Sequence, residues 1–292
     1  MATEIGRSET DAAEAKARIK EFALKRGALV CGVATAKSFD AVAPEGHRPG
    51  DLLPGARSVV VVGGAPPRAG DWISPTPEHQ ETMGTSQRIE PIGRQIAYQI
   101  EEELGYYALY VPGGVSRGNQ PFLSLMLAAE LAGLGSRSLA GPILHPKYGM
   151  LYYAAVVTTL PLPPDPPLEN PACPAPSCVE MWEREGTTPC IKVCPSNAGG
   201  CLDGRIENGR FVRTRYDRNR CHTRVYTNWV GGFQKALDAV LDEPDKEKRK
   251  MILYGSFFTK SLWSITYSGQ CQAQCFECVR VCPVGQEYRT KK

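Results

Sequence analysis

The sequence has no long apolar run, little net charge and no dinucleotide-binding glycine motif, and each absence excludes a class of protein. No apolar stretch approaches membrane-spanning length, and the N-terminal MATEIGRSETDAAEAKARIK has neither an apolar signal core nor a twin arginine. The net charge of +3 gives no electrostatic case for nucleic acid. Gly63-Gly64 follows an apolar run, but Pro66-Pro67 and the lack of G-x-G-x-x-G argue against a nucleotide site. We expect a cytoplasmic protein with neither a membrane nor a nucleic-acid partner.

The composition is that of an ordinary globular protein, except for its cysteines. The 292 residues suit two domains, and 42% of them are hydrophobic and 22% charged. A reducing compartment disfavours disulfides among the 11 cysteines. The cysteine content therefore favours metal binding.

Two C-x3-C-P motifs organise the second half of the chain. Cys275-Phe-Glu-Cys278-Val-Arg-Val-Cys282-Pro283 is a fragment of the run by which ferredoxin-type proteins hold 4Fe–4S clusters, and Cys190-Ile-Lys-Val-Cys194-Pro195 repeats its second half. In such motifs the proline turns the last cysteine toward the other cluster, so two motifs predict two clusters that exchange this ligand. A zinc ribbon is the alternative, but zinc ligand pairs usually lack the trailing C-x3-C-P.

The exchange predicts which thiols share a cluster. The first cluster takes three cysteines of the first motif region and the last one of the second: Cys173, Cys178, Cys190 and Cys282. The second cluster takes Cys194 together with Cys275 and Cys278. Two choices stay open, Cys173 against Cys201 and Cys275 against Cys271.

Apolar periodicity predicts the main elements. Continuous apolar runs predict buried strands at Leu29–Ala34, Ser58–Val62, Tyr106–Val111 and Leu151–Thr158. Helical spacing predicts a helix from Asp11 to Gly27, one through Ile92 to Gly105, one over Phe122–Ala132 that begins at Pro121 and closes at Gly133, and one over Phe233–Leu241. Cys31, alone among apolar residues, is expected to be a core thiol.

The remaining segments are expected to be connections. Residues 44–56 and 65–80 read as loops, the second lid-like, and the charge run Asp242–Lys250 as a solvated helix end or turn. Prolines crowd Pro161–Pro176, so a boundary between domains 1–165 and 166–292 is expected there.

Four segments, taken in order, are similar to one protein family. They are Leu53-Pro-Gly-Ala-Arg-Ser-Val-Val60, Ala132-Gly-Leu-Gly135, Pro142-Ile-Leu-His-Pro-Lys-Tyr-Gly149 and Val156-Val-Thr-Thr-Leu-Pro-Leu-Pro163, and cysteine pairs follow directly. This order resembles the epoxyqueuosine reductase and reductive dehalogenase superfamily over most of residues 15–285. The resemblance implies an α+β fold class: a nitroreductase-like α/β domain that binds a corrinoid, then a ferredoxin-like domain with two 4Fe–4S clusters.

The resemblance also implies site residues. Near the corrinoid, which is expected between the domains, would lie Gly135, Ser136, Arg137, Lys147, Tyr148 and Gly149. The alternative for the two glycine loops is simple turn chemistry, with left-handed backbone at Gly135 and Gly149. The lone Cys221 would complete the second cluster, which leaves Cys31, Cys201 and Cys271 without a cluster role.

The function that this implies is an iron–sulfur oxidoreductase that passes single electrons through two clusters to a cobalamin or related corrinoid, which acts on a small substrate. Its electron donor would be a ferredoxin or a flavodoxin. One alternative is a non-catalytic electron carrier or reductive activator of a partner corrinoid protein. Another is a zinc-stabilised interaction module.

One departure from the family concerns the proton donor. Family members that reduce epoxyqueuosine in tRNA have an acidic residue on the connection before the A-G-L-G helix, whereas residues 111–120 here contain no carboxylate. Tyr152 and Tyr153 are the remaining candidates. The helical repeats that end many of those enzymes are also missing from this sequence. We therefore expect that the chain does not reduce epoxyqueuosine.

Overall fold

The structure is a computed structural model, and it describes residues 9–68, 72, 82–111, 116–117, 120–194, 200–217, 229–256, 258–259, 262 and 277–290. The chain divides into two compact units. The first comprises Met1–Ala65, Thr85–Arg137 and Pro142–Ala172, and the second comprises Pro66–Gly84, Ser138–Gly141 and Cys173–Lys292. Within the described residues, no helix has the length and apolar character needed to cross a membrane.

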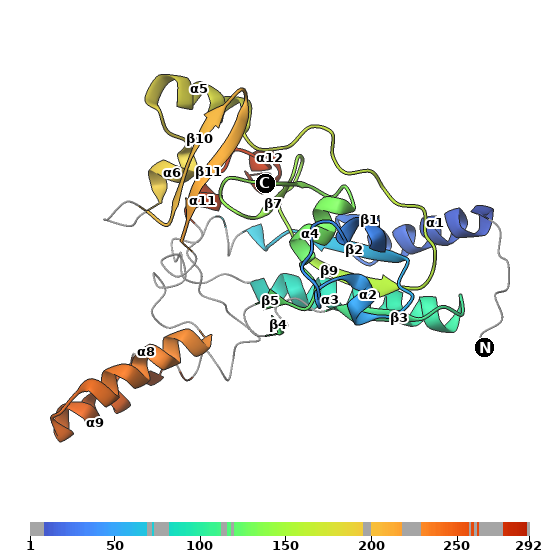
Figure 1. The fold of residues 1–292 in the computed structure, drawn as a ribbon. Coiled ribbons are helices and arrows are strands. Elements are labelled where there is room, and N and C mark those ends of the chain that lie inside the picture. The colour runs from blue at the N-terminus through green and yellow to red at the C-terminus, as the bar shows by residue number, and fades with distance from the viewer. Residues whose placement is uncertain are drawn as a thin grey trace. The chain divides into compact units, whose positions relative to one another are not determined.

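A four-stranded sheet forms the centre of the first unit (Figure 1). Its order is β1 (Val30–Thr35), β2 (Ser58–Gly64), β9 (Tyr152–Thr158) and β3 (Ala108–Val111), and each neighbouring pair is antiparallel. The strands are apolar at consecutive positions because both faces of the sheet are covered. All four predicted strands are present.

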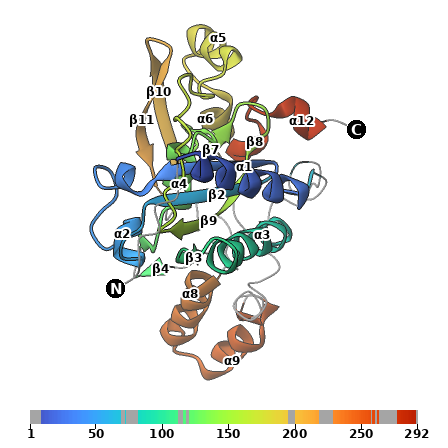
Figure 2. The same cartoon turned by 90° about the vertical axis from the view of Figure 1, so that its right-hand side faces the viewer.

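Helices cover the two faces of this sheet (Figure 2). Helices α1 (Glu9–Lys25) and α3 (Thr82–Glu102) share one apolar core with the sheet, to which they contribute Ile19, Ile96 and Ile100. Helix α4 (Leu125–Leu131) contacts β1, β2 and β9. Each of the three isoleucines is at most 1% exposed, and burying such a side chain contributes about 1.5–3 kcal/mol.

The helix ends follow local chemistry. Gly27 after α1 and Gly105 after α3 have φ of 98° and 71°, as expected for glycines that end helices. The prediction that α4 begins at Pro121 is wrong. Its N-cap is Ser124, whose Oγ accepts a hydrogen bond from the Leu127 N–H at 3.2 Å.

Short elements complete the first unit. Pro121 belongs to β5 (Gln120–Pro121), which pairs with β4 (Ser116–Arg117). A 3-10 helix η1 (Ala36–Phe39) follows β1. The predicted loop at 44–56 contains a short helix, α2 (Pro49–Leu52), which Pro49 starts. The predicted loop at 65–80 lies almost entirely outside the described residues.

The edge strand β1 is closed by the proline-rich segment that follows β9. The Asp165 N–H donates to the Val33 carbonyl at 2.8 Å, and its Oδ2 accepts from the Val33 N–H at 2.8 Å. Lys16 and Lys20 of α1 each place Nζ 2.8 Å from Asp165 Oδ1. An open strand edge invites pairing with other chains, and here Asp165 pairs both backbone groups of Val33.

The second unit consists of short helices around one β-hairpin. The elements are α5 (Pro176–Glu185), α6 (Pro189–Val193), β10 (Leu202–Glu207), β11 (Arg210–Tyr216), α11 (Glu277–Arg280) and α12 (Gln286–Thr290). Helix α6 packs against both β10 and α11. Asn208 and Gly209 form the hairpin turn with φ of 51° and 71°, the left-handed pair that suits a tight hairpin.

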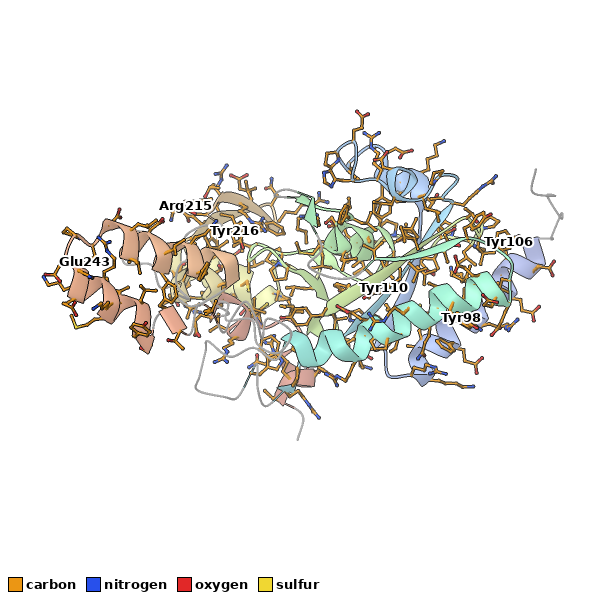
Figure 3. The ribbon with its side chains drawn as sticks, turned by 90° about the horizontal axis from the view of Figure 1, so that it is seen from below. Tyr98, Tyr106, Tyr110, Arg215, Tyr216 and Glu243 are labelled. Atoms are coloured by element: carbon orange, nitrogen blue, oxygen red, sulfur yellow. The ribbon has the colours of Figure 1, made fainter. Side chains whose placement is uncertain are left out.

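Helices α8 (Trp229–Asp242) and α9 (Lys246–Tyr254) pack against each other, with Glu243 in the turn that joins them (Figure 3). The helix predicted at Phe233–Leu241 is therefore confirmed. The charge run Asp242–Lys250 covers the end of α8, the turn and the start of α9. Asp245 is the N-cap, and its Oδ1 accepts from the N–H groups of Glu247 and Lys248 at 2.9 Å.

Candidate functional site

Four thiols from distant parts of the chain lie close together in the second unit. Cys178 lies in α5, Cys190 lies in α6, and Cys282 comes two residues after α11. Burial is the main cause that raises the pKa of Cys173, and charge on each of these three thiols raises it further, so all three lie near Cys173. These are the four cysteines whose spacing predicted one shared cluster.

Local contacts hold the four thiols in place. Both α5 and α6 begin with a proline in the first turn. The prolines fix where the two helices start and therefore where Cys178 and Cys190 lie. The Leu139 N–H points at Cys173 Sγ at 3.5 Å, and Thr188 Oγ1 lies 3.3 Å from Cys190 Sγ. Arg213 of β11 fixes the Leu139 segment by donating to the Leu139 carbonyl at 2.8 Å.

With no metal bound, the electrostatic environment of the four thiols favours their neutral, protonated form. Burial is the largest influence and raises the pKa of Cys173 to about 12 and that of Cys282 to about 11. Burial also raises the pKa of Cys178 and of Cys190, and the thiols raise one another's values further. A metal removes this penalty because a coordinated thiol is deprotonated outright.

A buried guanidinium stands beside Cys282, one of the four thiols. Arg289 of α12 is 5% exposed, donates from Nη2 to the Cys282 carbonyl, and lies over the Trp72 ring at 4.5 Å from its centroid. Its Nη1 is buried and has no hydrogen-bond partner in the described part of the chain. Arg289 lowers the pKa of Cys282, although burial and the other thiols outweigh it. A buried, incompletely paired cation calls for a negative group nearby.

The ligands predicted for the second cluster are only partly described. Cys194 ends α6 and Cys278 lies in α11, and these two helices pack together. Cys221, Cys275 and Cys271 lie outside the described residues. Charge on Cys194 reaches Cys190 and raises its pKa, so the two sets of ligands adjoin at α6.

Cys201, which the spacing argument kept open as the alternative to Cys173, lies beside Cys194. The two Sγ atoms are 3.2 Å apart, and the Cys201 N–H donates to Cys194 Sγ at 3.2 Å. Gly200 has φ of 60°, and a Cβ there would stand 3.3 Å from Cys194 Sγ and 3.2 Å from the Leu202 carbonyl oxygen. The backbone turn thus requires glycine at 200 to bring the two cysteines together.

Among the described residues, no three His, Cys, Asp or Glu side chains are arranged to hold one metal ion. An iron–sulfur cube binds each thiolate through a different iron. Its ligands therefore surround a larger volume than those of a single ion. For a cube, the relevant observation is the convergence of the four thiols.

The six residues predicted near a corrinoid come together in the first unit on a small sheet. It consists of β6 (Ser136–Arg137), β7 (Ile143–His145) and β8 (Gly149–Met150). A Cβ on Gly135 would stand 2.5 Å from Ile143 Cγ2, and Ser136 Oγ accepts from the Ala172 N–H at 2.7 Å. Gly149 is left-handed with φ of 72°, as the turn alternative predicted. For Gly135 that alternative is wrong, because close packing explains the glycine there and the left-handed residue is Gly133, with φ of 70°.

The other three residues present polar groups. Arg137 is exposed and pairs with Glu130 at 3.1 Å. Lys147 lies 5.3 Å from the centre of the Tyr148 ring, which is half-buried and tilted against His145. These side chains, unlike Gly135 and Ser136, have atoms available to a ligand.

The two candidate proton donors are neighbours on β9 that point to opposite faces of the sheet. Tyr153 pairs with Gly63, where a Cβ would stand 2.8 Å from the Tyr153 ring. Its hydroxyl is buried and has no partner among the described residues, and burial raises its pKa. Tyr152 is half-buried. A tyrosine with a raised pKa keeps its proton, so Tyr153 suits donation only to a strongly basic product.

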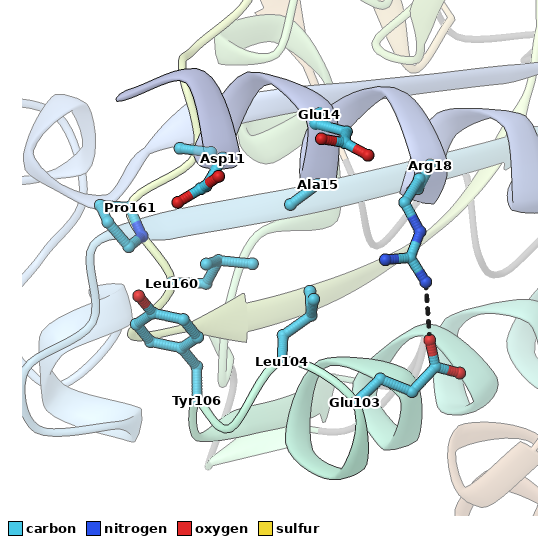
Figure 4. A pocket seen from close by; sticks show the side chains of 10 residues that line it. Asp11, Glu14, Ala15, Arg18, Glu103, Leu104, Tyr106, Leu160 and Pro161 are labelled. Atoms are coloured by element: carbon cyan, nitrogen blue, oxygen red, sulfur yellow. Dashed lines mark hydrogen bonds and ion pairs between the residues drawn. The ribbon is translucent and has the colours of Figure 1, made fainter. Parts of the chain in front are cut away.

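A surface hollow in the first unit lies away from these residues (Figure 4). It is lined by the start of α1 and the end of α3, and the ion pair of Arg18 with Glu103, 2.9 Å long, crosses it. None of the predicted site residues lines it. The chemistry of the hollow is that of a solvated ion pair, so we place the functional site at the thiols.

The fold is that of the epoxyqueuosine reductases. A selenomethionine-labelled epoxyqueuosine reductase matches with a TM-score of 0.53 and 18% identity over 94% of this chain and 66% of that one. The enzyme from Streptococcus thermophilus matches with a TM-score of 0.52 and 18% identity over 93% and 66% of the two chains. At this level of identity, the structures show the shared fold.

Sequence comparison points to the same proteins. Epoxyqueuosine reductase from Bacillus cereus is 29% identical over 114 residues, which are 36% of this chain and 27% of that protein. No model of a known protein family matches the chain. The resemblance predicted from the motifs is confirmed, and the chain spans 66% of the length of the solved reductases that it matches.

Sequence reasoning missed Arg289 and the contact that Cys201 makes. Arg289 is one of several basic residues near the end of the sequence, and no motif distinguishes it. Cys201 stayed open as the alternative to Cys173, and its contact with Cys194 was not predicted. For both residues, the signal is spatial proximity to a thiol.

Proposed function

We propose that the chain is a reductase whose second unit holds iron–sulfur clusters and supplies electrons to a corrinoid-dependent reaction. The convergence of Cys173, Cys178, Cys190 and Cys282 carries the proposal. When bound, a 4Fe–4S cluster accepts and releases one electron at a time. The likeness in fold to epoxyqueuosine reductases supports a reductase as the class of enzyme.

The surroundings of the four thiols fit such a cluster. A cube held by four thiolates is negative, and the buried Nη1 of Arg289 lacks a partner among the described residues. The Leu139 N–H and the Thr188 hydroxyl are placed to donate to thiolate sulfur. Hydrogen bonds of this kind and burial set the potential of a cluster. In the proposed mechanism, these groups compensate the charge and keep water away from the ligands.

The second cluster would use Cys194, Cys221, Cys275 and Cys278, and the helix pair α6 and α11 would bring two of these together. A ferredoxin or a flavodoxin would supply the electrons. The adjoining ligand sets would give the electron a short path between the clusters.

For the corrinoid, the first unit offers Arg137, Lys147 and Tyr148 as ligand-facing groups and Tyr153 as a proton donor whose buried hydroxyl has no partner among the residues that the structure describes. A bound corrinoid would supply the cobalt chemistry at the substrate. Arg137 and Lys147 would pair with its negative or carbonyl groups, and Tyr148 would pack against it. The substrate would be a small molecule, since residues 111–120 lack the carboxylate that reduction of epoxyqueuosine uses.

A second candidate function is an electron carrier that reduces a partner corrinoid protein. Gly135 and Ser136 favour this function, because packing and hydrogen bonding within the first unit give these two of the six predicted cofactor residues a structural role. Both candidates share the clusters and differ in the corrinoid.

Anaerobic purification tests both candidates. We expect a brown protein with iron and acid-labile sulfide in the amounts of two 4Fe–4S clusters, and an electron paramagnetic resonance signal after reduction. Adding cobalamin under reducing conditions should shift its visible spectrum and raise the melting temperature. Without that shift, the electron carrier is the better proposal. A colourless protein that binds zinc would contradict both.

A further inference from the structure

Cys194 and Cys201 form a pair that the cluster scheme does not need. Their Sγ atoms are 3.2 Å apart, whereas two ligands of one cube bind different irons and cannot touch in this way. Both residues are only partly buried. Gly200 holds the backbone turn that produces the contact.

The two sulfurs are not equivalent. The Cys201 N–H donates to Cys194 Sγ at 3.2 Å, so Cys194 Sγ is the sulfur that the backbone of its neighbour holds in place. Cys201 Sγ lies 3.2 Å from that sulfur and is placed to attack it once it has been modified. This is the arrangement of an attacking and a resolving thiol.

We propose that Cys194 and Cys201 form a reversible disulfide when Cys194 is not bound to iron. The Cys194 thiolate attacks a small disulfide RSSR, forms a mixed disulfide and releases one RSH after protonation. The Cys201 thiolate then attacks Cys194 Sγ, which forms the protein disulfide and releases the second RSH. The two protein thiols lose two electrons and two protons in total, and RSSR gains them.

The consequence rests on the proposed function, because Cys194 is a predicted ligand of the second cluster. While the disulfide is present, this thiolate is unavailable to iron. Oxidation would thus block assembly of the second cluster and leave the four thiols of the first untouched. A dithiol reductant would reverse the block.

The test uses the full chain after iron removal under reducing conditions, equilibrated with mixtures of reduced and oxidised glutathione. Trypsin cleaves after Lys192 and Arg205, so both cysteines lie in the peptide VCPSNAGGCLDGR. After alkylation, mass spectrometry separates the disulfide form from the doubly alkylated form. We expect this peptide to oxidise at a glutathione disulfide ratio about tenfold lower than the peptides with Cys178 or Cys282.

Variants separate the two roles. Cys201→Ser should accumulate glutathione on Cys194, because nothing resolves the mixed disulfide, while Cys190→Ser should still form the pair. Prior oxidation should lower reconstituted iron by about half in the wild type, as one of two clusters is lost, and dithiothreitol should restore it. Cys201→Ser should reconstitute both clusters.

Three results would overturn the proposal. The peptide could stay doubly alkylated until all thiols oxidise, Cys194 could bond a different cysteine, or Cys201→Ser could lose a cluster, which would make Cys201 a ligand. A wild-type chain that binds no iron would refute the proposed function instead. The peptide measurement would still decide the disulfide.

Discussion

The two units bury different kinds of group. The first buries valine and isoleucine on both faces of its sheet, and its one thiol, Cys31, packs against that apolar core. The described part of the second unit buries few apolar side chains, which include Leu139, Leu202, Ala236, Val240, Val279 and Val284, and instead brings four thiols near one another. A small core supplies little stability. We infer that the first unit folds by apolar burial and the second by binding its clusters.

Removal of iron should have the largest effect, and it should affect the two units differently. A chelator and reductant should abolish hydrogen-exchange protection in α5, α6 and the β10–β11 hairpin, because cluster binding is also folding free energy there. Protection in β2 and β9 should persist. Equal loss in both units would show that they fold as one cooperative body.

Exchange of one ligand should have the next largest effect. Cys282→Ser should lower the iron content by about half, because Cys282 is the proposed ligand of one of two proposed clusters. Cys31→Ser is the matched control and should retain all iron. Burial among apolar groups raises the pKa of Cys31 to about 12 and identifies it as a core thiol. A Cys282→Ser protein with full iron would refute the exchanged-ligand scheme.

The charge beside the first cluster offers a finer test. Arg289→Gln should lower the reduction potential of that cluster by on the order of 50 mV, about 1 kcal/mol for one electron, since a nearby cation favours the more negative reduced form. Redox titration followed by electron paramagnetic resonance measures it. Arg289→Lys retains the charge and should recover most of the shift. Equal potentials in all three proteins would make Arg289 purely structural.

Asp165 provides a test confined to the first unit. Burial works to raise its pKa, but hydrogen bonds from Lys16, Lys20 and the Val33 N–H outweigh it and lower the pKa below the ordinary value. The stabilisation is therefore present above about pH 4, the ordinary value, and is lost as the pH falls through the lowered one. Asp165→Asn should cost about 1–2 kcal/mol at neutral pH, and the cost should vanish in acid. Denaturant titration at both pH values measures it.

The smallest effect is expected at the hollow of Figure 4. The side chains of Arg18 and Glu103 are 51% and 52% exposed, and an ion pair in solvent contributes about 0.5 kcal/mol or less. Arg18→Ala should leave stability, iron content and potential within error. A loss of reductase activity in this variant would move the functional site to the hollow.

The sequence predicted the parts of the molecule that depend on local pattern. Continuous valine runs gave the sheet, and Ile92, Ile96 and Ile100 gave α3. Motif spacing predicts that Cys282 shares a cluster with Cys173, because the C-x3-C-P motif directs its last cysteine to the other cluster, and this pairing stays a prediction. The start of α4 was misplaced, since Pro121 and Ser124 are both plausible helix starts and tertiary pairing of β5 decides between them.

The remainder of the site depends on distant contacts. The role of Gly135 was misjudged because the close approach of Ile143 is invisible in the order of residues. The role of Arg289 depends on the contact between α12 and the Cys282 carbonyl, which the order of residues does not show. Residues that act through three-dimensional neighbours have no signature in a single sequence.

The position of Cys282 in the chain also orders events during synthesis. A ribosome delivers the chain from its N-terminal end, so the sheet of the first unit, completed by β9, emerges and folds before the last thiol exists. If Cys282 is a ligand as proposed, Cys173, Cys178 and Cys190 wait until it has been made. Insertion of the proposed first cluster then follows the synthesis of Cys282, and the cell must keep three thiols reduced throughout that interval.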